Sequence, residues 1–468
     1  MSLLKRSNVT NKMLKILCEK LVYFYAKVLC MIWQTLRYLI TFFLPSFYKR
    51  IQAKNLKNVQ VNGPVIIAMN HPNAFTDPIY FCYVYYPWKS FFLARGDAFK
   101  PGLISYLLEA MGVVPIFRMQ DAGKEGLKKN DESYQRVNYL LRKGSKIIVF
   151  AEGLCVQERR LRPLKKGVAR MVFGAYEALN SDKLVVVPIG VNYSKPHRFR
   201  SNVFYNVGEP IPVKDFIPEY TQNPAKTYNT FLQVLEPKMR ALITHIEDRQ
   251  NDELVYQVEE LCKKDELMSQ GLDYTNLEHD FRVLTRLTEK VNAAARTNPE
   301  LIAELKPLSR SYFKELEQSK LKDWLINPKQ NKNVTWPVFT VRLMLLVMGA
   351  PIYVGALVGN YFPFILAHML TKKNIKNIEF YSSIAIGSGM FLFWINYILW
   401  FTVIYTFSPS VLWPFCMCFL FALSAWFSLY YHPFMKKTFG MARILKNKPL
   451  ALKLGRDREK LLSLINKF

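Results

Sequence analysis

The segment VIIAMNHPNAFTDP, residues 65–78, decides how this chain is expected to fold. Its first five residues are apolar, which is typical of a strand buried on both faces of a sheet. Behind the strand come His71 and Asp77, separated by turn-forming residues. A histidine beside a carboxylate can accept a proton from a hydroxyl group. The alternative is a plain turn in which Asp77 caps a helix.

The surrounding region, residues 60–213, alternates between short β-rich runs and helical segments. The expected strands are 65–69, 90–94, 113–117, 146–150, 184–191 and 202–211, and the expected helices include 101–111, 131–143 and 166–180. This alternation predicts an α/β domain with a mixed, partly parallel sheet flanked by helices. Active residues of such sheets gather just past the carboxyl ends of strands, where both His71 and Glu152 lie.

Four further segments flank this domain: 1–59, 214–335, 336–435 and 436–468. The first is rich in aromatic residues and is expected to dock on a membrane through amphipathic helices, with one spanning helix as the alternative. The second predicts two or three solvent-facing helices, because apolar residues recur at three and four positions, and the alternative is that it only packs on the α/β domain. The last predicts a basic amphipathic helix on anionic lipid, since it carries eight basic and two acidic residues from Arg443 onward.

The segment 336–435 contains three runs without Lys, Arg, Asp or Glu, at 343–370, 380–407 and 411–435. The last two are long enough to span a bilayer. Lysines follow the first and third runs, and positive loops favour the cytoplasmic side. We therefore expect 380–407 to cross outward, 411–435 to return, and 343–370, which contains Gly and Pro, to form a hairpin that enters and leaves on one side. Three simple crossings are the alternative.

Charge and composition restrict the class of partner. The 468 residues carry a formal net charge of +28, which requires an anionic partner. The uncharged runs favour an anionic membrane surface over nucleic acid, because a soluble nucleic-acid binder has no use for them. Seven scattered cysteines do not form a disulfide pattern and indicate a reducing compartment. The six histidines are far apart in sequence, so no metal site is expected.

Three more motifs follow along the domain. GVVPIFR, residues 112–118, ends a strand in Arg118, whose planar guanidinium suits phosphate, although a plain surface charge is the alternative. FAEGLC, residues 150–155, places Glu152 and Gly153 after a strand, and a basic run follows that could bind phosphate or face anionic lipid. The motif VVVPIGVNY, residues 185–193, taken by itself indicates a core strand.

Together, in this order, the four blocks resemble the four motifs of the glycerophospholipid acyltransferase family, which includes lysophosphatidate and glycerol-3-phosphate acyltransferases. The resemblance covers residues 60–212. It implies that His71 is the general base and Asp77 its partner, and that Pro188 belongs to the acyl-side motif. It also implies that Arg118, Glu152 and Gly153 hold the glycerol phosphate of the acceptor. The other predicted substrate-binding residues are Asn73 and, from the basic run, which could bind a glycerol phosphate or the phosphates of coenzyme A or acyl carrier protein, Arg159, Arg162, Lys165 and Lys166.

The chain departs from the usual motifs at three places. Five residues separate His71 from Asp77, where four are usual. Ala151 replaces the usual Pro before Glu-Gly, and Cys155 replaces a common Ser or Thr. The His-Pro-Asn form resembles a divergent branch with bacterial members and relatives of the fungal-type glycerol-3-phosphate acyltransferases.

The resemblance implies an integral membrane enzyme whose catalytic domain lies on the cytoplasmic face. It would move an acyl group from acyl-coenzyme A or acyl carrier protein to lysophosphatidate or glycerol 3-phosphate. The acyl donor is a substrate, and no cofactor is expected. Anionic membrane lipids are the expected partners. Three alternatives stay open, namely another lysolipid as acceptor, an acyl-enzyme formed on Cys155, and a catalytically inactive lipid-binding scaffold.

Overall fold

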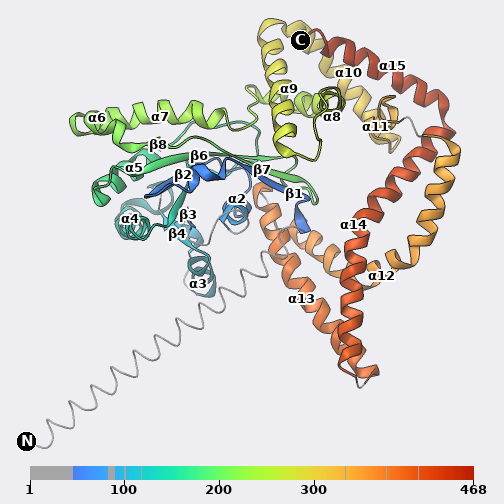
Figure 1. Ribbon diagram of the computed structural model, residues 1–468, viewed down its shortest axis with the longest axis horizontal. Coiled ribbons are helices and arrows are strands. Elements are labelled where there is room, and N and C mark those ends of the chain that lie inside the picture. Colours follow the sequence, from blue (N-terminus) through green and yellow to red (C-terminus); the bar gives the residue numbers. More distant parts are fainter. Residues whose placement is uncertain are drawn as a thin grey trace, which may run out of the picture.

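The computed structural model describes residues 46–82, 90–99, 102–117, 119–331, 334–375, 377–408 and 410–468. The docking helices predicted for the N-terminal segment fall on residues 1–45, outside the described residues, and so does Arg118. Three structural parts are visible, an α/β unit, a helical bundle and a group of long apolar helices (Figure 1).

One mixed, mostly parallel sheet organises the α/β unit, which confirms the predicted fold class. Its strands are β1 Arg50–Lys54, β2 Val65–Met69, β3 Ser90–Arg95, β4 Val113–Ile116, β5 Lys146–Phe150, β6 Val185–Tyr193, β7 Asn202–Val207 and β8 Ile211–Pro212. Their order is β1-β7-β6-β2-β5-β3-β4, with β8 paired to β6. β2 runs parallel to both β5 and β6, whereas β7 is antiparallel to β6.

Helices cover both faces of this sheet. They are α2 Thr76–Tyr80, α3 Leu103–Ala110, α4 Met119–Arg142, α5 Lys166–Leu179, α6 Ile217–Gln222 and α7 Pro224–Arg240. Short 3₁₀ turns lie at Leu56–Val59, Gly96–Ala98 and Val213–Phe216 of this unit, and two more, Arg249–Asn251 and Ile378–Phe380, precede helices of the other parts. Ile66 and Ala68 of β2 share a core with residues of α4, α5 and α7. Val65 and Ile67, which point to the other face, pack with Tyr48 and with residues around α2.

The α/β unit is wider than the predicted range 60–213. β1 extends the sheet by pairing with β7, from Arg50 opposite Asn202 to Lys54 opposite Asn206. After the last strand, α7 contributes Phe231 and Leu235 to the core cluster that includes β2 and β5. The segment from 214 therefore begins as part of the unit that it follows.

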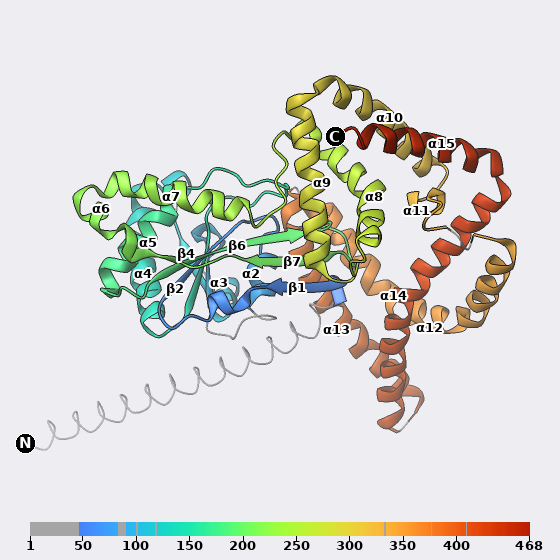
Figure 2. The ribbon, with the colours of Figure 1, turned by 45° about the horizontal axis from the view of Figure 1, so that its top comes forward.

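A second hydrophobic core belongs to a helical bundle (Figure 2). Its helices are α8 Asp252–Ser269, α9 Leu277–Thr297, α10 Pro299–Gln318, α11 Asp323–Ile326 and α15 Lys448–Ile465. The bundle touches the sheet through α9, where the rings of Phe281 and Phe204 lie 5.4 Å apart. The helices from α8 to α11, within the predicted segment 214–335, therefore build a core of their own, whereas α7 packs on the α/β unit.

The C-terminal tail corrects one prediction. Residues 436–446 continue the preceding long helix, and α15 lays its apolar face on protein, not on lipid. Leu454, Leu461 and Leu464 of α15 are buried in the bundle core. An amphipathic pattern shows that one face of a helix must be buried, but it does not say against what.

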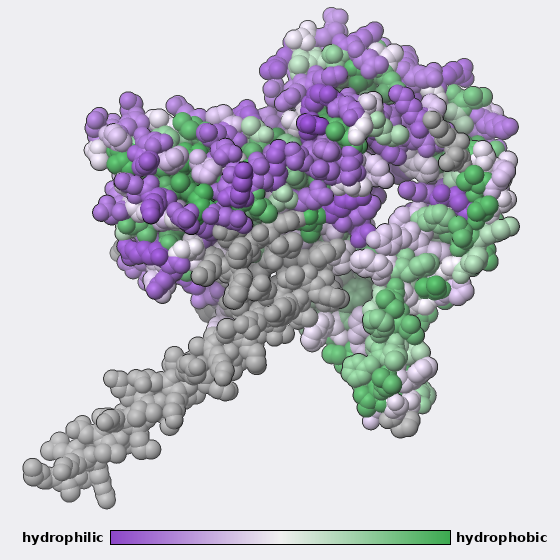
Figure 3. Space-filling view, in the orientation of Figure 1, coloured by the Kyte–Doolittle hydropathy of each residue, from purple (hydrophilic) through white to green (hydrophobic). Residues whose placement is uncertain are grey.

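Three helices are long and apolar enough to cross a membrane among the residues described, α12 Trp336–Asn374, α13 Tyr381–Phe407 and α14 Leu412–Lys446. Apolar side chains cover the free end of the α13–α14 pair, while hydrophilic side chains dominate the visible face of the α/β unit and bundle (Figure 3). The hairpin predicted within 343–370 is wrong in form, because α12 is one helix. It is bent (Figures 1 and 2), as expected for a helix with Pro351 and Pro363 in its interior.

Polar and small residues hold these apolar helices together. Gly359 of α12 has no room for a side chain, since an added Cβ would lie 2.5 Å from the Phe421 ring of α14. The Asn360 amide donates to the Phe421 carbonyl at 2.9 Å, and Asn396 of α13 donates to the Gly359 carbonyl at 2.8 Å. Close approach at small residues and interhelical hydrogen bonds are the usual means of association in lipid.

Candidate active site

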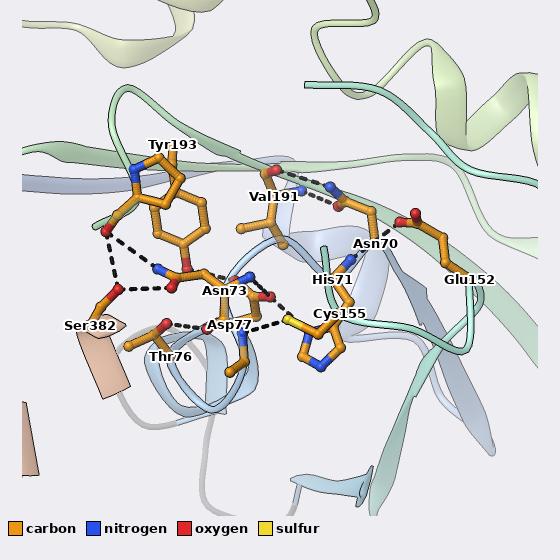
Figure 4. A network of polar contacts seen from close by, with 12 residues as sticks. Asn70, His71, Asn73, Thr76, Asp77, Glu152, Cys155, Val191, Tyr193 and Ser382 are labelled. Carbon is orange, nitrogen blue, oxygen red and sulfur yellow. Dashed lines mark hydrogen bonds and ion pairs between the residues drawn. The ribbon is translucent and has the colours of Figure 1, made fainter. Parts of the chain in front are cut away.

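His71 and Asp77 meet at the carboxyl end of β2 (Figure 4). His71 Nδ1 lies 2.8 Å from Asp77 Oδ2. The Asp77 side chain is fully buried, whereas that of His71 is 16% exposed. The Phe150 ring of β5 stacks on the imidazole, with 3.6 Å between the ring centroids. With Nδ1–H donating to the carboxylate, Nε2 is the nitrogen that can accept a proton.

The loop between the two residues is shaped by Ala74, which has φ +37. That left-handed conformation is unusual for a residue with a side chain. It turns the chain so that α2 begins at Thr76 and presents Asp77 back to His71. The helix-cap alternative does not fit, because the Asp77 carboxylate is engaged by His71 and by donors outside α2.

Asp77 has a complete set of donors. Oδ2 also accepts from the Asn73 N–H at 2.9 Å, and Oδ1 accepts from the Tyr193 hydroxyl at 2.6 Å. The Tyr205 hydroxyl donates to the Asp77 carbonyl at 2.9 Å. Sequence reasoning missed both tyrosines, although Tyr193 closes the motif VVVPIGVNY. A buried carboxylate with several donors is held in one orientation.

Glu152, at the carboxyl end of β5, is buried and connects two backbone segments. One oxygen accepts from the His71 N–H at 3.3 Å and the other from the Arg162 N–H at 3.2 Å. Burial raises the pKa of Glu152 from 4.5 to about 7, against the opposing effect of these two donors. The carboxylate therefore fixes the backbone of the histidine relative to that of the basic run.

The basic run itself folds back onto the end of β5. The Lys165 N–H donates to the Ala151 carbonyl at 2.9 Å, and Gly153 adopts φ +67 with Lys165 packed on its open side. Lys165 and Lys166 are exposed and Arg162 is partly exposed. No carboxylate of the described residues forms an ion pair with these three cations, so they are free to bind an anion.

Three residues predicted to contact substrate have other contacts. Asn73 is fully buried and its amide bonds to Tyr48 and Ser382. The Arg159 guanidinium pairs with Glu259 at 2.7 Å and is buried at the bundle interface. Pro188 is buried within β6, opposite Ala68 of β2. Each of the three is used in packing or hydrogen bonding within the protein, and their roles as substrate contacts stay predictions.

Asn130 of α4 is a site residue that the sequence did not reveal. Its side-chain amide clamps Phe117, accepting from the Phe117 N–H at 2.7 Å and donating to the Phe117 carbonyl at 2.6 Å. Asn70 clamps Val191 of β6 in the same way, at 2.7 and 3.1 Å. Both asparagines fix the chain at a strand end, one beside His71 and the other just before Arg118.

Cys155 takes part in the loop as a hydrogen-bond acceptor. Its Sγ lies 3.0 Å from the Ala74 N–H. Burial raises the pKa of the Cys155 thiol well above its ordinary value. A protonated, partly buried thiol that already accepts a hydrogen bond is a poor nucleophile, so the geometry disfavours an acyl-enzyme on this residue.

The Cys155→Ser variant should therefore keep acyl-transfer activity within about threefold, because a serine hydroxyl can also accept from the Ala74 N–H. The measurement is kcat for acyl transfer, with mass spectrometry of the protein during turnover to look for a bound acyl group. A thioester on Cys155, together with loss of activity in the variant, would overturn the expectation.

Glu152 gives the site a pH-dependent contribution to stability. A carboxyl group with a raised pKa binds a proton in the folded state between pH 4.5 and 7 when the unfolded chain does not. Stability from this group therefore falls as pH rises through that window, by about 3 kcal/mol in all.

The Glu152→Gln variant cannot titrate. We expect it to be less stable than wild type at pH 5, because one N–H loses its acceptor, and to approach or exceed wild type at pH 8. Thermal unfolding at both pH values tests this, and a constant difference would contradict it.

Metal ligands are not assembled here. Among the residues that the structure describes, no group of three or more His, Cys, Asp or Glu side chains could hold a metal ion.

Comparison with known proteins agrees with this geometry. Residues 50–192 match the family model described as Acyltransferase. Glycerol-3-phosphate O-acyltransferase 1 of Saccharomyces cerevisiae is 33% identical over 117 residues, 24% of this chain and 15% of that protein. Glycerol-3-phosphate O-acyltransferase 2 of the same organism is 37% identical over 106 residues, 22% of this chain and 14% of that protein. The chain thus matches only a small part of the length of either relative.

Among solved structures, the crystal structure of the 1-acyl-sn-glycerophosphate (LPA) acyltransferase PlsC from Thermotoga maritima is similar with a TM-score of 0.33 and 16% identity, over 46% of this chain and 80% of that one. The sequence match, with a His–Asp pair at the end of β2, defines residues 50–192 as an acyltransferase domain. Outside this domain the comparisons assign no family, and the similarity to the yeast glycerol-3-phosphate O-acyltransferases covers 24% and 22% of this chain.

Proposed function

We propose that this protein is a membrane-bound O-acyltransferase that moves a fatty acyl group from an acyl thioester to a glycerol phosphate acceptor. The observation that carries the proposal is the His71–Asp77 pair, with Nδ1 bonded at 2.8 Å and the imidazole partly exposed. The matched yeast proteins are named as glycerol-3-phosphate acyltransferases, so glycerol 3-phosphate is the first acceptor to consider and lysophosphatidate the second.

In the proposed reaction His71 Nε2 takes the proton of an acceptor hydroxyl as the oxygen attacks the thioester carbonyl. An O–C ester bond forms and the C–S bond breaks. The proton then passes from the imidazolium to the leaving thiolate, and Asp77 stabilises the imidazolium between these steps. No covalent acyl-enzyme is needed, because both substrates are held together at the base.

The acceptor phosphate is assigned to the basic run after β5. Arg162 and Lys165 are connected to the base through Glu152 and the end of β5. Lys166 begins α5, a helix whose N-terminal N–H groups also favour an anion. Arg118 joins this set by its motif. A phosphate bound there would keep the glycerol hydroxyl within reach of His71.

The long apolar helices α12, α13 and α14 would attach the protein to the membrane. α12 contacts the polar parts of the protein at two places, its first turn, where Val338 packs on the bundle core, and its second half, where Phe364 lies 5.9 Å from Phe199 of the α/β unit. We therefore assign the bilayer crossing to the α13–α14 hairpin, whose tip at Ser408 is uncharged. Lysines near the other end, including Lys372 and Lys437, support a cytoplasmic catalytic domain.

The basic side chains at this junction support anionic lipid as a partner. Arg200 lies over the Tyr430 ring at 5.6 Å and Lys437 over the Trp324 ring at 5.7 Å. Burial, then repulsion by Arg50, Arg200 and Lys437, lowers the pKa of Lys49. Like charges gathered at the membrane side favour a negatively charged headgroup layer.

The experiment is acyl transfer by the purified, detergent-solubilised full chain. Labelled acyl-coenzyme A and acyl carrier protein are each offered with glycerol 3-phosphate and with lysophosphatidate. Labelled lysophosphatidate or phosphatidate, absent with His71→Ala, is the expected result. Transfer that survives the substitution would overturn the role of His71. Transfer to neither acceptor would overturn the glycerol phosphate assignment and favour another lysolipid or the inactive scaffold.

A further inference from the structure

The catalytic loop is in direct contact with the start of a membrane helix. Ser382, in the first turn of α13, is fully buried. Its hydroxyl lies 2.8 Å from Asn73 Oδ1 and 3.1 Å from the Pro196 carbonyl oxygen (Figure 4). More than 300 residues of sequence separate Ser382 from Asn73. The membrane hairpin thus touches the loop that carries the proposed base.

Asn73 lies at the centre of a closed set of hydrogen bonds. Its Nδ2 donates to the Tyr48 hydroxyl at 2.7 Å, and that hydroxyl donates to the Pro196 carbonyl at 2.9 Å. Ser382 completes the ring through Asn73 Oδ1 and Pro196. Buried polar groups that are all partnered in this way hold one arrangement, and loss of one member leaves its neighbour unsatisfied.

The ring is one bond away from the catalytic pair. The Asn73 N–H donates to Asp77 Oδ2, the oxygen that also receives His71 Nδ1. The next residue, Ala74, holds φ +37, a conformation that persists only when surrounding contacts impose it. Apolar contacts add to the restraint, because Phe380 meets the Phe75 ring at 6.5 Å and Ile386 packs on the core beneath.

We propose that Ser382 is a positioning residue of the active site, through which α13 sets the geometry of the His71–Asp77 pair. The inference rests on the proposed acyl transfer. Its consequence is that catalysis depends on the seating of the α13–α14 hairpin, so that the site is complete only when the membrane helices are in place. Neither Ser382 nor Asn73 needs to touch a substrate for this role.

The test compares Ser382→Ala with Ser388→Ala in the full chain. Ser388 is the matched control, because it lies on the same helix, is partly exposed and, among the described residues, bonds to the Ile384 carbonyl of its own helix. We expect Ser382→Ala to lower kcat about tenfold with KM for both substrates within twofold, since a small displacement of the base costs rate and not binding. Ser388→Ala should match wild type. A kcat for Ser382→Ala equal to that of the control would overturn the proposal.

A second variant separates positioning from general loss of folding. Tyr48→Phe removes only the Tyr48 hydroxyl, which belongs to the same closed set of hydrogen bonds around Asn73. We expect it to lower kcat as well, and the double variant with Ser382→Ala to lose less than the product of the two single effects, because both act through Asn73. Independent effects that simply multiply would overturn the shared path.

Hydrogen exchange gives a readout that does not depend on turnover. Backbone amides of residues 71–77 should exchange faster in Ser382→Ala than in Ser388→Ala, and equal exchange would contradict the coupling. If the two variants differ in hydrogen exchange as expected but the wild-type protein transfers no acyl group, the proposed reaction is wrong and the contact between α13 and the loop still stands. An active wild type with an unaffected Ser382→Ala would sink the positioning role alone.

Discussion

Replacement of His71 by alanine is expected to lower kcat for acyl transfer by about 10²–10⁴-fold, the usual contribution of a positioned general base. The acceptor hydroxyl is a weak nucleophile at neutral pH until a base removes its proton. Of the two paired side chains, His71 is the one that a hydroxyl group can reach, because its imidazole is partly exposed whereas Asp77 is fully buried and its oxygens are engaged by His71, Asn73 and Tyr193. Initial rates with labelled acyl thioester measure the effect.

Two further variants make this result specific. His71→Gln retains an N–H donor for Asp77 but cannot take up a proton, so it should be nearly as inactive as His71→Ala while unfolding close to the wild-type temperature. His197→Ala is the matched control, since His197 is exposed and bonds only to Gln157 among the partners that the described residues provide. It should stay within twofold of wild type. Full activity in His71→Gln would assign the proton transfer to another group.

The central strands could be predicted from the sequence for a physical reason. A strand buried on both faces must be continuously apolar, so VIIAM and KIIVF identify β2 and β5 to the residue. β1 was missed because RIQAK is a half-buried edge strand with mixed polarity. It becomes a strand only by pairing with β7, about 150 residues later.

The candidate site was predictable only where motif and strand end coincide. His71, Asp77 and Glu152 follow strands or lie in the turn after one, which is visible in the sequence. Their orientation depends on the left-handed Ala74 and on Tyr193 and Ser382, which reach the loop from far along the chain. Such contacts leave no local pattern, and for the same reason the sequence did not show that Asn73 is buried and hydrogen-bonded to Tyr48 and Ser382.

The C-terminal helix offered a signal of a different kind. Leu454, Arg458, Leu461 and Ile465 fall on one face of α15 at helical spacing, so an arginine occupies the apolar face. A buried arginine needs a carboxylate partner, which lipid hydrocarbon does not supply. Arg458 on the apolar face therefore predicts that this helix packs on protein and not on lipid.

Removal of this side chain in Arg458→Met is expected to destabilise the protein by about 3–5 kcal/mol, the usual cost of leaving a buried charge without its partner. Arg458 Nε donates to Asp323 Oδ1 at 2.9 Å, and its NH2 group donates to the Leu261 carbonyl at 2.9 Å. Asp323 is 2% exposed, so water cannot replace the guanidinium. Methionine fills much of the volume, which makes the loss of charge and hydrogen bonds the main effect. Chemical unfolding in detergent measures it.

Two variants test the cause of that loss. Lys453 lies on α15, like Arg458, and forms an exposed ion pair with Glu315 of α10. Lys453→Ala should not measurably change unfolding, because a surface ion pair contributes little to stability. The double variant Arg458→Met with Asp323→Asn should recover part of the stability lost in Arg458→Met, since it no longer buries an unpaired carboxylate. If the double variant lost as much as the two single changes added together, the pair would not be coupled. In that case the buried leucines of α15, and not this ion pair, would hold the helix in the bundle. Apolar packing would then anchor the C-terminal end of the membrane hairpin.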